Sequence, residues 1–224
     1  MRKILGLFHF SSTFIRFVRN PDRLDLVFKL VDNLDPDAPA AKAMFSRPDV
    51  AAFLAQRHPA LRFELASLRA MPEGSLGRHF AAFLDQRGLD PAGLYHSDDD
   101  APSDRDRFKL HMERSHDLWH TVLGFDTDVA GELGLQAFTM AQLGSPLGYM
   151  ILSAGLLNTM FSAPGDGDRR MEGITRGWQL GQRLRPLFGA DWATMITWPI
   201  EQVRAHFGVD AADVRTAAMA AMAA

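Results

Sequence analysis

The chain contains no cysteine. This absence excludes disulfides and thiolate metal sites, so any bound metal must be held by His, Asp and Glu. No apolar run is long enough to span a bilayer. The 24 Lys and Arg against 27 Asp and Glu give a net charge of -3, which argues against nucleic acid as a main partner. Strand signals are almost missing, because no period-two alternation is sustained and no Asn-Gly turn occurs.

Apolar residues instead recur at helical spacing through most of the 224 residues. We therefore expect an all-α fold: a single multi-helix domain of about eight to ten helices. A long helix is predicted over 104–123, with Ser103 as its N-cap and Gly124 as its C-cap. The next helix should be capped by Asp126 or Asp128 and end near Gly144.

Three segments are expected along the chain. Residues 1–20 are basic and rich in Phe. Such a segment lies on an anionic membrane surface or packs its Phe face on the core, and a mitochondrial transit peptide is a third interpretation. Residues 21–209 should form the all-α domain, and residues 210–224 an Ala- and Met-rich helical tail. The helix expected over 146–160 is apolar most of the way round, so it should be central and could line an apolar groove.

The candidate metal ligands lie on two consecutive predicted helices. His116 and His120 are one helical turn apart and share a face. If the helix after Gly124 runs antiparallel, Glu132 returns to the level of His120, which gives a central metal-bearing helical hairpin. Nitrogen and oxygen ligands of this kind suit a zinc-type divalent metal. Asp117 either reaches the metal as a ligand or orients what the metal binds.

Other interpretations of these residues remain open. Two His at this spacing also occur as ordinary structural residues. His111 is rotated off the stripe, so we interpret it either as a bystander or as a residue that contacts the metal ligands from outside. A zinc protease would need Glu at position 117, and a His-Asp phosphohydrolase would need a further His and a distal Asp.

The sequence around these residues resembles the family of coenzyme Q (ubiquinone) biosynthesis protein four. The likeness is carried by His116-Asp117-x-x-His120 with Glu132 after eleven further residues, and by the blocks around them. The preceding segment, from Gly74 to Asp90, is also similar. The resemblance weakens towards the ends of residues 20–209, and Ala193 and Thr194 stand where the family pattern has acidic residues.

The resemblance implies that His116, Asp117, His120 and Glu132 all bind the metal, with zinc expected and iron as the alternative. It also implies oxidative decarboxylation of a polyprenylated hydroxybenzoate, in which the ring carboxylate is replaced by a hydroxyl. Zinc has no redox chemistry, so the reaction would need oxygen and an electron-rich ring, or iron at the same ligands. The alternative is a prenyl-lipid-binding scaffold with a structural metal. A catalytic role beyond metal binding is assigned to no residue except, as a candidate, Asp117.

Further expectations concern partners and location. The resemblance implies a polyprenylated benzoate or quinone precursor as substrate and other ubiquinone-biosynthesis proteins as partners. It also implies peripheral attachment to a membrane surface. A homodimer is compatible with the sequence. We expect the cytoplasmic face of a bacterial inner membrane, since no long presequence is seen, or the mitochondrial inner membrane in a eukaryote.

Overall fold

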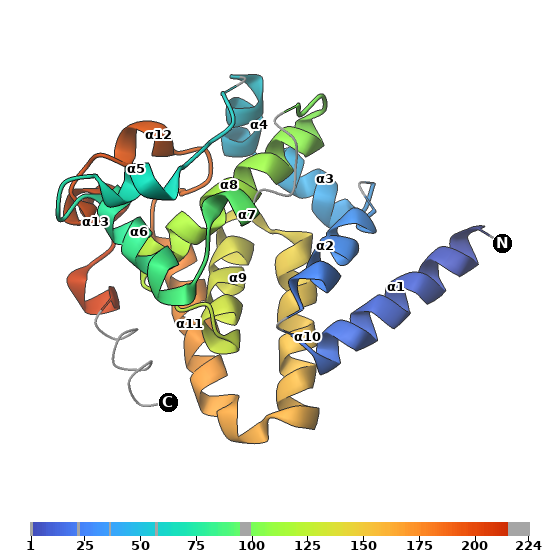
Figure 1. Ribbon diagram of the computed structural model, residues 1–224. Coiled ribbons are helices and arrows are strands. Elements are labelled where there is room, and N and C mark those ends of the chain that lie inside the picture. The colour runs from blue at the N-terminus through green and yellow to red at the C-terminus, as the bar shows by residue number, and fades with distance from the viewer. Residues whose placement is uncertain (1, 22, 36, 57, 95–99, 215–224) are drawn as a thin grey trace. The chain divides into compact units, whose positions relative to one another are not determined.

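A computed structural model describes residues 2–21, 23–35, 37–56, 58–94 and 100–214 (Figure 1). Within these ranges the chain is helical and has no β-strand, only an isolated bridge between Ser75 and Pro199. The all-α prediction is therefore confirmed. The predicted tail over 210–224 lies mostly outside the described residues. The chain divides into two compact units, and residues 21–209 contribute to both.

Unit 1 consists of Met1–Ser46 and Asp126–Arg183, and unit 2 of Arg47–Phe125 and Leu184–Ala224. The helices of unit 1 are α1 (Arg2–Arg19), α2 (Leu24–Asp32), α3 (Pro39–Phe45), α9 (Val129–Leu143), α10 (Pro146–Ser162), η1 (Pro164–Asp166) and α11 (Gly167–Arg183). The helices of unit 2 are α4 (Pro48–Ala55), α5 (Leu65–Arg69), α6 (Leu76–Arg87), α7 (Pro91–Leu94), α8 (Asp104–Leu123), α12 (Trp192–Met195) and α13 (Ile200–Phe207).

The 13 α-helices in the described residues exceed the expected number because several connections contain short helices of their own. For example, α5 has 5 residues and α7 and α12 have 4 each. Such helices are too short to show a periodic apolar stripe, so the sequence pattern does not reveal them.

In unit 1, α9 is the most deeply buried helix and packs against both α10 and α11 (Figure 1). Glycines on α11 allow the two backbones to approach closely. A Cβ added at Gly173 would lie 2.6 Å from the Ala130 carbonyl oxygen, and one at Gly181 would lie 2.7 Å from that of Phe138. A Cβ at Gly177 would overlap the Gly134 carbonyl oxygen. Only glycine fits at these contacts.

The prediction that the helix beginning at Pro146 is central is wrong. Helix α10 buries one face, which includes Ile151, Leu152 and Gly155, against the rest of unit 1. Its opposite face is also apolar and is exposed. The large exposed side chains on this face are Tyr149, Leu156, Leu157, Met160 and Phe161.

The segment predicted over residues 1–20 is helical as α1. Its Phe17 is buried in the core of unit 1, and Phe10 and Phe14 pack against that core. The Asn158 side-chain amide on α10 donates to the Val18 carbonyl at 2.8 Å. This part of α1 therefore packs its Phe face on the core, which is one of the three interpretations of the sequence. None of the described helices is both long and apolar enough to cross a membrane.

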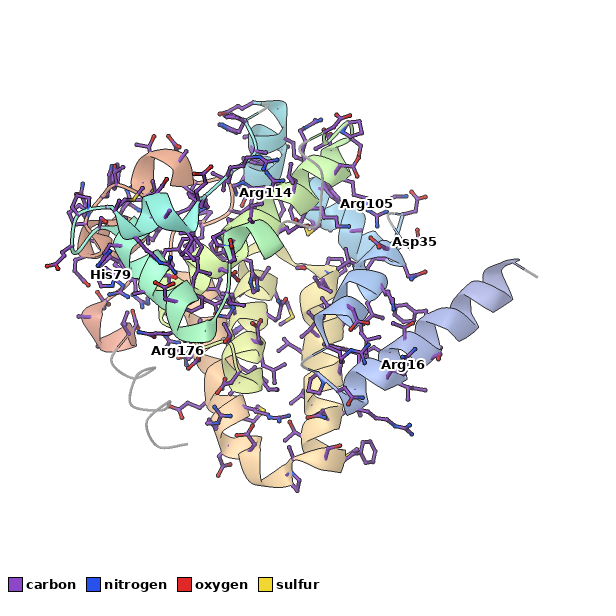
Figure 2. The ribbon with its side chains drawn as sticks, in the orientation of Figure 1. Arg16, Asp35, His79, Arg105, Arg114 and Arg176 are labelled. Carbon is purple, nitrogen blue, oxygen red and sulfur yellow. The ribbon has the colours of Figure 1, made fainter. Side chains whose placement is uncertain are left out.

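In unit 2, α8 packs against α4, α6 and α13. The buried side chain of Arg114 on α8 (Figure 2) donates from Nη1 to the Leu61 carbonyl at 3.1 Å. The start of α6 is held by backbone bonds to the loop before α13, where the N–H of Gly77 donates to Ile196 at 2.8 Å. These bonds hold α8 to the segment before α5 and α6 to the segment before α13, and α6 itself packs against α8.

Candidate metal centre

Helix α8 begins and ends where the sequence predicts. A reciprocal capping box joins Ser103 and Asp106 at its start, and Gly124 caps its end with φ of 72°. The left-handed backbone conformation at this position favours glycine. Because the helix is regular between these caps, His116 and His120 lie one turn apart on the same face, and Asp117 follows His116 directly.

The structure brings His116, Asp117 and His120 together. One nitrogen or oxygen atom from each lies within 4.8 Å of the others. The two imidazole rings are 4.8 Å apart between centroids and nearly perpendicular, at 71°. His116 Nδ1 lies 3.2 Å from Asp117 Oδ1. In the described part of the chain this is the one group of three His, Cys, Asp or Glu residues close enough to hold a metal.

The orientation of His120 is set by a backbone group. Its Nδ1 lies 3.3 Å from the Phe125 carbonyl oxygen, and a carbonyl only accepts, so Nδ1 carries the proton. In the neutral ring Nε2 then has the lone pair. This atom is buried. A histidine that donates from one ring nitrogen to a carbonyl while the other binds a metal is the usual arrangement in metal sites.

The carboxyl of Asp117 has a pKa below its ordinary value. Burial alone would raise the pKa, but the hydrogen bond from His116 and the electrostatic effects of His116, His120 and Arg87 outweigh burial. Asp117 is therefore a carboxylate at neutral pH, as a metal ligand must be. The Thr121 hydroxyl donates to the Asp117 carbonyl at 3.1 Å, which keeps the helix closed around this turn.

The three side chains fit a divalent metal in donor type and approximate spacing. Zinc binds His nitrogen and carboxylate oxygen at about 2.0–2.2 Å in a tetrahedron, so neighbouring ligand atoms stand about 3.4 Å apart. Ligand atoms within 4.8 Å of each other reach that spacing through small side-chain rotations. The bond between His116 and Asp117 would then be exchanged for bonds to the metal, with release of any shared proton.

Glu132, the predicted fourth ligand, lies in the first turn of α9. Its position on that helix is well defined. Asp128 caps α9 by accepting from the Gly131 N–H at 2.8 Å, and Arg169 on α11 pairs with Asp128. A Cβ at Gly131 would collide with the Asp126 backbone, so the turn before Glu132 is tight. Glu132 belongs to unit 1 and the other three residues to unit 2, so its membership of the ligand set stays a prediction.

His111 lies on α8 within an aromatic cluster. Its ring centroid is 4.3 Å from that of Phe53 and 5.1 Å from that of Phe188. The Gly189 N–H donates to its Nε2 at 3.1 Å, so the ring is neutral with the proton on Nδ1. Burial and the nearby charge of His58 lower its pKa from 6.5 to about 4.

Sequence reasoning gave no role to three residues that surround the site. Phe83 on α6 stacks on His120, with ring centroids 5.9 Å apart and planes at 25°. The Arg87 guanidinium carbon lies 3.9 Å from the centre of the Phe83 ring. Arg204 on α13 donates to the Val122 and Thr121 carbonyls at 3.1 and 3.3 Å and so caps the end of α8. The sequence does show that Phe83 and Arg87 are four residues apart on one predicted helix, which predicts that their side chains can contact each other.

The chain is similar to curated mitochondrial ubiquinone biosynthesis proteins. It is 29% identical over 178 residues to coq4 of Talaromyces stipitatus, which covers 75% of this chain and 58% of that protein. It is 25% identical over 189 residues to COQ4 of Yarrowia lipolytica, which covers 82% of this chain and 66% of that protein. The chain therefore spans less than two thirds of the length of these relatives.

A solved structure and a family model agree with these similarities. The crystal structure of a Nostoc punctiforme protein assigned to ubiquinone biosynthesis superposes with a TM-score of 0.77 at 29% identity. The superposition covers 90% of this chain and 97% of that one. The family model for coenzyme Q (ubiquinone) biosynthesis protein Coq4 matches residues 9–213. The chain therefore belongs to the Coq4 family of coenzyme Q (ubiquinone) biosynthesis proteins.

Proposed function

We propose that this protein acts in ubiquinone biosynthesis as a metal-dependent enzyme. The proposed reaction replaces the ring carboxylate of a polyprenylated hydroxybenzoate with a hydroxyl. The observation that carries the proposal is the convergence of His116, Asp117 and His120 within 4.8 Å on one turn of α8, in a chain of this family. The proposed location is peripheral, on the cytoplasmic face of a bacterial inner membrane, together with other proteins of the pathway.

In this proposal the chain's residues hold and orient a divalent metal. His120 binds through Nε2 while the Phe125 carbonyl fixes its ring, and His116 and Asp117 bind from the same turn. Glu132 is the predicted fourth ligand. The negative charge of Asp117 offsets part of the metal's charge in a largely buried site. When bound, zinc would supply Lewis-acid polarisation of a carboxylate or phenolate oxygen, and iron at the same ligands would add redox chemistry.

The overall conversion is a two-electron oxidation. The bond between the ring and its carboxylate breaks and carbon dioxide leaves, while the ring gains a hydroxyl oxygen. Dioxygen is the class of oxidant we assign, because no side chain of this protein accepts two electrons. In balanced form the aromatic acid, water and dioxygen give the phenol, carbon dioxide and hydrogen peroxide. With zinc, dioxygen would have to react with an electron-rich hydroxylated ring, because zinc itself does not change oxidation state.

A second function is favoured by the exposed face of α10. Apolar side chains on this face are largely solvent-accessible, with Met160 at 60% and Phe161 at 73%. Exposed clusters of this kind mark surfaces that contact lipid or protein. The alternative is therefore a lipid-binding scaffold for the pathway's other proteins, with a metal that only stabilises the fold.

Metal analysis tests the site directly. The purified protein should contain close to one divalent metal per chain by mass spectrometry, together with extractable prenyl lipid. The double variant His116→Ala/His120→Ala should lose the metal, whereas His79→Ala/His206→Ala should keep it. His79 and His206 are exposed histidines on other helices of unit 2. The control therefore also removes two imidazole rings, but none from the proposed site. Retention of metal in the first variant would show that the ligands are wrongly assigned.

The variant Glu132→Gln distinguishes the enzyme hypothesis from the scaffold hypothesis. It removes one charged ligand with little change in shape. The enzyme hypothesis predicts that quinone production in cells lacking the native family member falls to background, while the variant stays folded and bound to its partners. The scaffold hypothesis predicts that metal is lost but quinone production continues. A metal-free wild-type protein without prenyl lipid would contradict both.

A further inference from the structure

The last turn of α8 carries His120, and an arginine from another helix closes that turn. The last carbonyls of an α-helix have no partner within the helix. At this end the Gly124 N–H donates to the His120 carbonyl at 2.8 Å. The Arg204 guanidinium on α13 donates from Nε to the Val122 carbonyl at 3.1 Å and from Nη2 to that of Thr121 at 3.3 Å. Its positive charge also suits the negative end of the helix dipole.

Each nitrogen of the Arg204 guanidinium has an acceptor. Besides the two carbonyls of α8, its Nη1 pairs at 2.8 Å with the exposed carboxylate of Glu201, one turn earlier on α13. The Arg204 side chain is mostly buried, and α13 packs against both α8 and α6. A planar guanidinium reaches these acceptors in a fixed geometry that a lysine ammonium does not reproduce. Arg204 therefore holds the backbone of α8 in place.

The turn that Arg204 closes also supplies the group that orients the His120 ring. The Phe125 carbonyl lies 3.3 Å from His120 Nδ1 and accepts its proton. Between the end of α8 and this carbonyl, the chain leaves the helix at Gly124, whose φ is 72°. The place of the Phe125 carbonyl relative to His120 therefore depends on the path of this short turn. By holding the last carbonyls of α8, Arg204 fixes where that path begins.

We propose that Arg204 is a positioning residue of the metal centre. By holding the end of α8 it keeps the Phe125 carbonyl on Nδ1 of His120, which leaves Nε2 with the lone pair for the metal. The inference rests on the proposed function, because it needs His120 as a ligand. It deepens that function by naming the residue that prepares this ligand. Losing the outer partners of a metal-binding histidine typically weakens metal binding roughly 10- to 100-fold.

The zinc affinity of the purified full-length protein measures this effect. Arg204→Gln loses the positive charge and the paired donors to the α8 carbonyls. Its dissociation constant for zinc, from competition with a chromophoric chelator, should rise roughly 10- to 100-fold above that of the wild type. Arg204→Lys keeps the charge but loses the planar fork, so its affinity should be intermediate. It also serves as the test variant if Arg204→Gln does not fold.

Two spectroscopic measurements report on the His120 ring itself. Cobalt takes the place of zinc at nitrogen and oxygen ligands and absorbs visible light according to its coordination. The cobalt spectrum of Arg204→Gln should differ from that of the wild type, because the ring is no longer held in one orientation. Imidazole nitrogen NMR of the metal-free protein at alkaline pH should show His120 protonated on Nδ1 in the wild type and a mixture of tautomers in the variant.

Arg78→Gln is the matched control. Arg78 is on α6 in the same unit and donates to the backbone carbonyl of Arg69 at the end of α5. The control therefore also removes an arginine from the end of a helix, but from one that carries no proposed ligand. Its zinc affinity and cobalt spectrum should match those of the wild type.

The outcomes separate a positioning role from a purely structural one. Urea unfolding measures the stability of every variant in parallel. If Arg204→Gln is less stable but keeps the zinc affinity, the cobalt spectrum and the His120 tautomer of the wild type, Arg204 only supports the fold and the proposal is overturned. A wild-type protein that binds neither zinc nor cobalt overturns the proposed function and the proposal together. Metal binding by the wild type and equally by Arg204→Gln overturns the role of Arg204 alone.

Discussion

At the scale of single residues, His111 should make stability depend on pH. It is neutral in the fold because burial and the charge of His58 lower its pKa from 6.5 to about 4. Between these two pH values the unfolded chain binds a proton that the folded chain does not. Stability should therefore fall as pH drops from 6.5 towards 4, by on the order of 3 kcal/mol for a shift of this size. Above pH 6.5 both states are neutral and the effect disappears.

The variant His111→Gln tests this contribution. Glutamine offers an acceptor to the Gly189 N–H but does not titrate in this range. Urea denaturation at pH 6.5 and at pH 4 should show a smaller loss of stability in the variant than in the wild type. His206→Gln is the control, because it removes an exposed ring on α13 that contacts Trp198 and Phe207 instead of this cluster. Equal losses in wild type and His111→Gln would contradict the assignment.

Some residues of the candidate site were predictable from sequence and others were not. His116 and His120 share a face because a helix repeats every 3.6 residues, and the caps that define this helix are local signals. Arg87 is different. Its place beside His120 depends on how α6 packs against α8, and no local pattern encodes that packing. A structure is needed to find a residue whose role comes from a tertiary contact.

At the scale of helices, the contact between α9 and α11 should be sensitive to a single methyl group. Gly177→Ala would place a Cβ on the Gly134 carbonyl oxygen, which is backbone and cannot move aside cheaply. The helices must separate, so we expect a loss of roughly 1–3 kcal/mol in the free energy of unfolding, despite alanine's better helix propensity. Thermal or urea unfolding measures this loss.

Gly167→Ala is the matched control on the same helix. A Cβ there would meet the Thr159 methyl at 3.6 Å, which is ordinary contact, so stability should be unchanged or slightly higher. If Gly177→Ala were as stable as wild type, the close approach of α9 and α11 would be wrong.

The signal for this helix pair was present in the sequence. Gly173, Gly177 and Gly181 recur every four residues and therefore lie on one face of α11. The pattern indicates a face that meets another backbone, but it does not name the partner helix. For α10 the sequence pattern misled. A helix that is apolar on all sides is expected to be buried, yet half of this one is exposed. Hydrophobicity alone does not distinguish a buried face from one that meets a lipid or protein partner.

At the scale of the whole molecule, the exposed face of α10 should attach the intact protein to membranes. Helix α1 packs on α10 and carries Arg16, which is exposed (Figure 2), and Arg19. Apolar side chains beside exposed arginines suit a surface of anionic phospholipid. The attraction between these arginines and anionic lipid is local, because the chain as a whole has a net charge of -3 and would be repelled. Raised salt should therefore weaken binding by screening the arginines.

Flotation with phospholipid vesicles measures this attachment. The wild-type protein should float with vesicles that contain anionic lipid. The variant Met160→Asp/Phe161→Asp should bind these vesicles at least about tenfold more weakly. It removes apolar side chains from the contact and adds negative charges that the anionic lipid repels. Ser153→Asp/Ser162→Asp adds the same charge at exposed polar positions of α10 and should bind more tightly than the first variant. Equal binding by the two variants would show that charge, and not the apolar face, governs attachment. Undiminished binding of Met160→Asp/Phe161→Asp would place the membrane contact elsewhere on the chain.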